Sequence, residues 1–148
     1  MTRRLTVDSP VGPLTLAEQD GALVGIAFRD ERGCDRTPLL VEAERQLTEY
    51  FAGRRRRFDL PLAPAGTTFQ KEVWAALCGI PYGQTRSYKD IAAAVGRPAA
   101  CRAVGMANNR NPLPIVIPCH RVIGASGALT GYAGGLDVKR RLLEIENL

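Results

Sequence analysis

The chain has 148 residues, 45% of them hydrophobic and 24% charged, an ordinary composition for a globular protein that buries its own core. No apolar run approaches the length of a membrane span, and no apolar segment follows the two N-terminal arginines as it would in a signal peptide. We therefore expect a cytosolic protein, not associated with a membrane, whose thiols stay reduced.

The net charge of +5 is distributed unevenly along the chain. Residues 1–65 contain ten Lys or Arg and ten Asp or Glu, whereas residues 66–148 contain ten and five, so the whole excess lies in the second part. Between Arg86 and Arg121 six basic residues accompany one acid, Asp90. This stretch favours a polyanionic partner, most plausibly nucleic acid, although a solvated basic surface explains the charge alone equally well.

The four cysteines show no tight metal-ligand spacing, and the chain has a single histidine. We therefore predict neither a metal site nor a cofactor. Cys34, Cys78 and Cys101 are expected to be inert thiols that pack as small hydrophobic side chains.

The N-terminal part predicts a small sheet and a helix. Residues 2–28 hold apolar runs separated by turn signals such as Asp20-Gly21, which indicates a β-meander. Residues 38–52 have apolar side chains at helical spacing, and Gly53 ends the pattern. The basic run Arg54 to Arg57 is interpreted as a solvated surface beyond the helix.

A linker is predicted at residues 60–66, where the charge balance also changes. Thr67 to Gln70 then forms a capping box at the start of a helix. A second box, Ser87 to Asp90, begins another short helix. A third helix is expected from Pro98 to about Asn108, which makes a helix-turn-helix pattern with Arg102 on its second helix.

The most informative stretch runs from Asn111 to Val122. Its β-branched run, Ile115 to Ile117, is flanked by prolines and predicts a short buried strand that ends abruptly at Cys119. The neighbouring His120 is the one side chain whose ordinary pKa lies near neutrality, and an imidazole can help convert a thiol into a thiolate. We interpret Cys119 as the reactive nucleophile.

The C-terminal segment predicts a loop and a helix. Residues 124–135 are rich in glycine, which suits either a loop whose backbone approaches a ligand or a flexible surface loop. Residues 136–146 have an apolar stripe at helical spacing, and Glu146 can face inward from that helix.

With these motifs in place, the chain resembles the DNA O6-alkylguanine alkyltransferases, and most closely their free-standing bacterial form. The residues that carry the resemblance are Ile117-Pro-Cys-His-Arg-Val-Ile123, Arg102-Ala-Val-Gly105, Asn111-Pro112, Gly131-Tyr-Ala-Gly-Gly135 and Lys139. The resemblance implies an α/β (α+β) fold with two domains. Residues 1–65 would form a small RNase H-like domain with an antiparallel sheet, and residues 66–148 a mainly helical DNA-binding and alkyl-acceptor domain.

The resemblance also implies a mechanism. Cys119 would take the alkyl group from guanine O6 in a direct displacement, and each molecule would act once because a thioether is too stable for water to release. His120 would act as the base through a water molecule, and Glu146 would orient the imidazole and stabilise its cation. Some relatives bind zinc in the N-terminal domain through cysteines and histidines, and this chain lacks those histidines.

On the DNA side, the resemblance implies a base flipped out of the duplex. Arg102 would fill the vacated stack, and Tyr88 would crowd the phosphate and donate to the purine ring. Asn111 would brace the turn between the recognition helix and the active site. The small residues that let this helix enter the minor groove are Ala103, Gly105 and Ala107. The alkylguanine pocket would be formed by Cys119, Val122, Tyr132, the Ala133 amide, Lys139 and Met106.

The implied partner is double-stranded DNA that carries O6-alkylguanine, bound by a monomer. The sequence leaves open the range of alkyl groups, activity on O4-alkylthymine and clustering on DNA. Two alternatives remain: a helix-turn-helix protein that binds alkylated DNA without chemistry, which the presence of Cys119 disfavours, and a cysteine hydrolase that uses Cys119 and His120. Adjacent residues of an extended segment point apart, which disfavours the hydrolase.

Overall fold

The computed structural model describes residues 1–147. The chain divides into two compact units, Met1–Ala65 and Gly66–Leu148, and each is described by itself. No helix among the described residues is long and apolar enough to cross a membrane.

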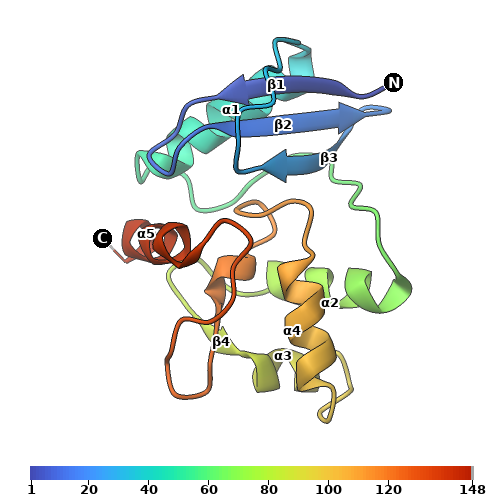
Figure 1. The fold of residues 1–148 in the computed structure, drawn as a ribbon, viewed down its shortest axis with the longest axis vertical. Helices are drawn as coiled ribbons and strands as arrows, with labels where there is room; N and C mark the ends of the chain where they lie inside the picture. Colours follow the sequence, from blue (N-terminus) through green and yellow to red (C-terminus); the bar gives the residue numbers. More distant parts are fainter. Residues whose placement is uncertain (148) are drawn as a thin grey trace. The chain divides into compact units, whose positions relative to one another are not determined.

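The N-terminal unit contains a three-stranded antiparallel sheet in the order β1 (Arg3–Val7), β2 (Leu14–Gln19) and β3 (Ala22–Ala27) (Figure 1). Leu5 lies opposite Leu16 in this sheet, and both side chains are buried. A bulge at Ala17 and Glu18 shifts the register before the turn into β3. The predicted meander is confirmed.

One helix, α1 (Pro38–Phe51), packs against this sheet. Its N-cap is Thr37, whose hydroxyl accepts a hydrogen bond from the Leu40 backbone amide and so satisfies a free helix donor. The helix buries a stripe toward the strands, which consists of Leu40, Ala43, Gln46, Leu47 and Tyr50. The predicted helix is therefore confirmed.

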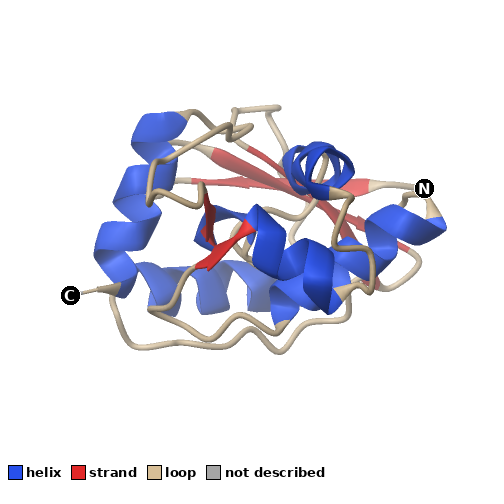
Figure 2. Cartoon of the chain, turned by 90° about the horizontal axis from the view of Figure 1, so that it is seen from below, coloured by secondary structure: helices blue, strands red, loops and turns tan. Residues whose placement is uncertain are grey.

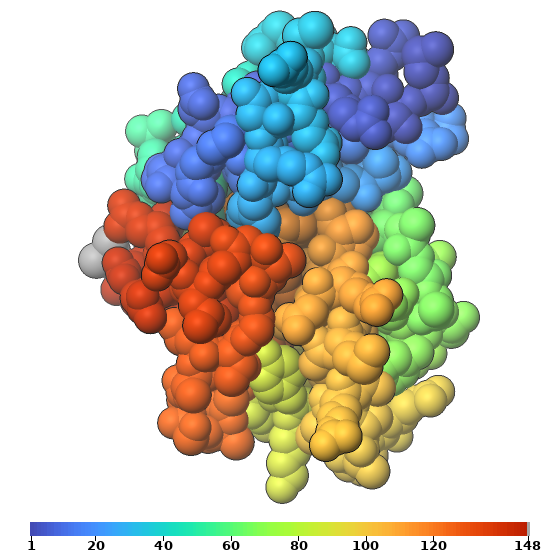
Figure 3. All heavy atoms as spheres, in the orientation of Figure 1, coloured from blue at the N-terminus to red at the C-terminus, as the bar shows by residue number. Residues whose placement is uncertain are grey.

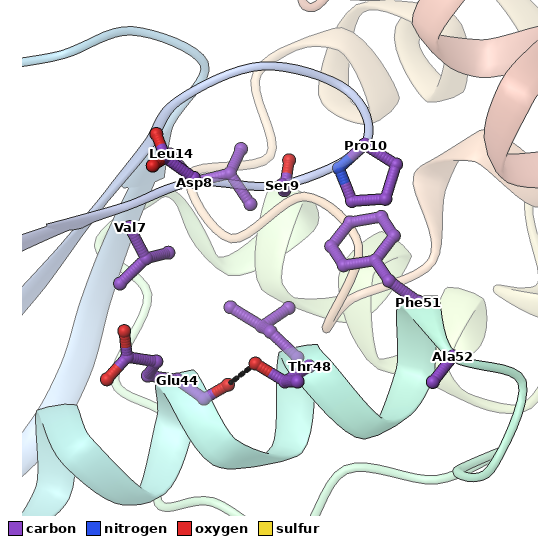
Figure 4. A pocket seen from close by; sticks show the side chains of 10 residues that line it. Val7, Asp8, Ser9, Pro10, Leu14, Glu44, Thr48, Phe51 and Ala52 are labelled. Carbon is purple, nitrogen blue, oxygen red and sulfur yellow. Dashed lines mark hydrogen bonds between the residues drawn. The ribbon is translucent and has the colours of Figure 1, made fainter.

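A depression of about 290 Å³ lies between the β1–β2 turn and α1 (Figure 4). The Pro10 ring faces the Phe51 ring at its rim, and the Thr48 hydroxyl donates to the Glu44 carbonyl within the helix. Its lining contains neither cysteine nor histidine, so it offers no thiol nucleophile and no imidazole base.

The C-terminal unit is mainly helical. Its helices are α2 (Thr68–Cys78), α3 (Tyr88–Ala94), α4 (Cys101–Asn109), α5 (Leu136–Glu146) and the one-turn 3-10 helix η1 (Cys119–Arg121). Two short strands, β4 (Arg86–Ser87) and β5 (Val122–Ile123), pair in parallel among them (Figure 2). Both predicted capping boxes are present, at the starts of α2 and α3.

The connection between α3 and α4 is longer than predicted. Gly96 adopts a φ of 74° after α3, and an additional turn follows in which the Ala100 amide donates to the Arg97 carbonyl. The helix expected from Pro98 therefore begins at Cys101. Helices α3 and α4 still pack against each other as a pair joined by a turn.

The predicted strand at Ile115 to Ile117 is wrong. This segment is a buried turn in which Ile115 has a φ of 73°, an uncommon value for a β-branched residue. The Asn111 side chain holds the turn, because its amide donates to the Ile117 carbonyl at 2.8 Å and its oxygen accepts from the Leu113 amide at 2.9 Å. These bonds satisfy backbone groups that a strand partner would otherwise pair.

Candidate active site

Cys119 is the first residue of η1 and is only 4% exposed. Burial raises the pKa of its thiol to about 11, while hydrogen bonds from Asn111 and Tyr132 and the charge of Lys139 act in the opposite direction. The thiol is therefore protonated at neutral pH in the resting protein. Nucleophilic attack by this sulfur requires a base that removes its proton.

The imidazole of His120 supplies a base beside this thiol. Its Nε2 lies 2.5 Å from Oε2 of Glu146, and both side chains are fully buried. Burial lowers the pKa of His120, and Glu146 opposes that change. The ring is therefore neutral, with its Nε2 proton donated to the carboxylate and its Nδ1 left as an acceptor that bonds to no described residue.

Arg121 is the residue at this site that sequence reasoning missed. Its Nε donates to Glu146 Oε1 at 2.8 Å, its Nη2 to Oε2 at 3.1 Å, and its Nη1 to the Ile80 carbonyl at 2.7 Å. The sequence signal was its place in the motif Pro-Cys-His-Arg-Val, but its charge was counted with the basic surface. At 6% exposure, Arg121 is buried in the site.

Burial is the main reason that the imidazole stays neutral, and Arg121 adds to it. Arg121 already balances the charge of Glu146 through two hydrogen bonds, so a proton on His120 would add an uncompensated charge to a buried site. The Gly83 amide also donates to Glu146, at 3.3 Å. The prediction that Glu146 faces inward is confirmed by its burial.

Lys139 is fully buried on α5. Its ammonium donates to the Thr130 carbonyl at 2.7 Å, which fixes the glycine-rich loop to this helix. Burial lowers the pKa of Lys139, and the nearby Cys119 sulfur opposes that change. A thiolate at Cys119 would therefore gain from this charge.

A surface depression of about 370 Å³ lies between α3, α4 and the glycine-rich loop. Figure 3 shows residues near 105 and near 130 on either side, with the residues near 88 between them. Arg102 and Gly105 line one wall, and Thr130 and Gly131 line the other. Tyr88 also lines this depression, and its hydroxyl forms a 2.8 Å hydrogen bond with the Thr130 hydroxyl.

Helix α4 has one exposed and one buried face. Arg102, Ala103 and Met106 lie on the exposed face, where Met106 is 59% exposed. The expected DNA contact at Ala107 is wrong, because this residue is 2% exposed and its carbonyl accepts from the Trp74 indole at 2.8 Å. Met106 was predicted to help form the alkylguanine pocket, and this role stays a prediction for an exposed residue of α4.

The remaining predicted site residues precede and follow Cys119 in the chain. Val122 is fully buried in β5, directly after η1. Tyr132 is half-buried, with its hydroxyl oxygen buried and hydrogen-bonded to Cys119, whereas Ala133 is exposed in the same loop. Asn111 approaches the thiol from the turn that it braces.

The other cysteines differ from the prediction. Cys34 and Cys78 are exposed and Cys101 is half-buried, so the expectation that they pack as small buried hydrophobic side chains is wrong. Among residues 1–147, no group of three or more His, Cys, Asp or Glu side chains could hold a metal ion. Cys119 alone of the four thiols is both buried and next to an imidazole.

Comparison with known proteins identifies the family. Residues 68–148 match the DNA binding domain of 6-O-methylguanine DNA methyltransferase, and residues 3–64 match its ribonuclease-like domain. The chain thus belongs to the O6-methylguanine DNA methyltransferase family, and the expected α+β fold is confirmed.

Relatives match over nearly the whole chain. The methylated-DNA–protein-cysteine methyltransferase of Methanosarcina barkeri is 53% identical, covering 95% of this chain and 94% of its own. The constitutive methylated-DNA–protein-cysteine methyltransferase of Bacillus subtilis is 51% identical over 97% and 94%. The crystal structure of Mycobacterium tuberculosis OGT in complex with DNA has a TM-score of 0.89 and 49% identity, covering 99% and 92%.

Proposed function

We propose that this protein repairs DNA by moving the alkyl group of O6-alkylguanine irreversibly to its own Cys119. The observation that carries the proposal is the buried Cys119 beside a neutral His120 that Glu146 and Arg121 hold in place. The names of the relatives support methyl transfer from DNA to a protein cysteine. The protein acts once per molecule and as a monomer.

The chemical step forms one bond and breaks one. The Cys119 sulfur attacks the alkyl carbon, the carbon–O6 bond breaks, and its electron pair stays on guanine. The thiol proton moves toward His120 through water, and the guanine anion takes up a proton to become ordinary guanine. Lys139 and Glu146 stabilise the charges that develop on the sulfur and the imidazole.

The buried sulfur requires that the damaged base leave the duplex. Arg102 lies exposed on α4 and takes the place of the extruded base, while Ala103 and Gly105 allow α4 to approach the minor groove closely. Tyr88 gives up its bond to Thr130, crowds the phosphate and donates to the purine ring. Arg121 is buried and makes no DNA contact.

The base is held by groups around Cys119. The carbonyls of Cys119 and Val122 accept from the guanine amino group, and the Ala133 amide donates to the O6 side. The Tyr132 ring covers the guanine ring, and its buried hydroxyl remains hydrogen-bonded to the Cys119 thiol. Asn111 keeps the acceptor turn in position throughout.

A single-turnover assay tests the proposal. Duplex DNA that carries a labelled O6-methylguanine is mixed with excess or limiting protein, and transferred label is measured over time. We expect transfer to reach a plateau at one methyl group per protein molecule. DNA binding without transfer would support the non-chemical helix-turn-helix alternative, and continued turnover would support a hydrolase.

A further inference from the structure

Asn108 is a buried polar residue to which the proposed chemistry assigns no role. It lies in the last turn of α4 at 2% exposure. Its Nδ2 donates to the Cys119 carbonyl over a long 3.4 Å, and its Oδ1 is buried and bonds to no described residue. A buried amide oxygen that no described residue satisfies needs another donor, because leaving it unpaired is costly.

Asn111 already provides that brace with shorter bonds of 2.8 and 2.9 Å to the Ile117 carbonyl and the Leu113 amide. The Trp74 indole separately fixes the end of α4 through the Ala107 carbonyl at 2.8 Å. The turn and the helix are therefore both held without Asn108. The buried Oδ1 of Asn108 is therefore not explained by a role in holding the turn or the helix.

A second buried acceptor without a described partner belongs to the residue next to Cys119. The Nε2 proton of His120 is donated to Glu146, so its Nδ1 can only accept. Asn108 Oδ1 and His120 Nδ1 thus both need a donor, and neither can satisfy the other. A water molecule has two O–H donors and can satisfy both, while its oxygen accepts from a thiol.

We propose that Asn108 is a positioning residue for proton transfer, whose Oδ1 and His120 Nδ1 together hold the water that receives the Cys119 proton. This inference rests on the proposed alkyl transfer. As the sulfur attacks, the thiol proton passes to the water oxygen, and the water gives one of its own protons to Nδ1. The water leaves the step unchanged, and the second O–H remains bonded to Asn108.

Asn108→Leu tests this role, because leucine has a similar shape and no polar atoms. We expect its single-turnover methyl transfer to fall by about 10²-fold, the lower end of the range of general-base effects. The loss should be the same for duplex DNA and for the free O6-alkylguanine base, because proton transfer is common to both. The rate should also rise with pH beyond the range where the wild-type rate is level.

Val104→Ala is the matched control on the buried face of α4. It loosens packing, so we expect reduced stability with an unchanged pH profile for the folded fraction. Asn108→Asp keeps an acceptor oxygen and should transfer methyl groups faster than Asn108→Leu, even if the leucine variant folds poorly. The charged groups that act on the pKa of His120 are Glu146, Arg121 and Lys139, and Cys119 is its neighbour in the chain.

The proposal is overturned if Asn108→Leu keeps the wild-type rate and pH profile, or loses activity on duplex DNA alone. Equal losses for Asn108→Asp and Asn108→Leu would also overturn it. Failure of the wild-type protein to methylate Cys119 would instead reject the proposed function itself.

Discussion

The two units of the chain differ in where their most closely linked charged side chains lie, exposed in the N-terminal unit and buried in the C-terminal unit. In the N-terminal unit, Arg45 bonds to Glu42 and Glu49 along one exposed face of α1. In the C-terminal unit, four ionisable side chains are buried around one thiol, namely His120, Arg121, Lys139 and Glu146. Exposed pairs contribute little to stability, whereas burying charge is costly. The buried charges around Cys119 therefore lower the stability of the fold, and their proposed role is in the reaction of the thiol.

The largest effect is expected when the buried pair is broken. Arg121→Met leaves the Glu146 carboxylate buried without its cation, which should lower the free energy of unfolding by about 3–5 kcal/mol. Arg45→Met, in the exposed network of α1, should change it little. Urea denaturation of both variants measures this, and similar losses would remove the contrast between the units.

Glu146→Gln should affect the reaction next most strongly. The amide cannot stabilise an imidazolium, so the single-turnover rate should fall by roughly 10²-fold, the scale of general-base catalysis. Glu144→Gln is the matched control on α5, since Glu144 is exposed and pairs only loosely with Arg141, at 3.8 Å. A comparable loss in the control would show that the helix surface, not the buried carboxylate, matters.

Arg102→Ala should reduce repair of duplex DNA about tenfold more than reaction with the free O6-alkylguanine base, because extruding the base from its stack costs a few kcal/mol. The control is Arg140→Ala, another exposed arginine in the same unit. Rates with both substrates are compared for each variant. Equal losses of Arg102→Ala on both substrates would reject its stacking role.

The last prediction concerns the dependence of stability on pH, which distinguishes the two units. The pKa of His120 is lowered in the folded state, so below about 6.5 the unfolded chain binds a proton that the folded chain does not. Stability should fall there by up to about 1.4 kcal/mol per pH unit. Hydrogen bonds from Arg45 and Gln46 lower the pKa of Glu42 to about 2. The stability that the ionised Glu42 contributes is therefore lost only as the pH falls below about 4.5.

Chemical denaturation between pH 8 and pH 4 measures this separation. The loss that begins near pH 6.5 should disappear in His120→Gln and persist in Glu42→Gln. If the loss of stability below pH 6.5 is unchanged in His120→Gln, a group other than His120 causes it.

Local signals explain why much of the fold could be predicted. The boxes at Thr67 to Gln70 and Ser87 to Asp90 join residues three positions apart, so the sequence displays the whole interaction. The turn at Ile115 was missed because the β-branched pattern favours a strand, while the Asn111 side chain stabilises a positive φ instead. Here hydrogen bonds from one side chain to the backbone outweighed the strand propensity of the segment.

In the site, too, residues adjacent in the sequence could be predicted from the pattern alone, whereas contacts made only in the fold could not. Cys119 and His120 are adjacent and stand out in the sequence, but Arg121 and Glu146 are 25 residues apart and meet only in the fold. In the sequence, Asn108 marks only the approximate end of a predicted helix, whereas its burial beside the Cys119 carbonyl is a property of the fold. Composition could not distinguish the buried charge of Arg121 from the exposed charge of Arg102.

The most direct test of the account is to find the atom that receives the alkyl group. The protein is incubated with a duplex oligonucleotide that contains O6-methylguanine, then digested and analysed by peptide mass spectrometry. We predict one methyl group on the peptide that holds Cys119, none in Cys119→Ser, and full transfer in Cys34→Ser. An unmodified Cys119, or a methyl group on one of the more exposed cysteines, would contradict the account.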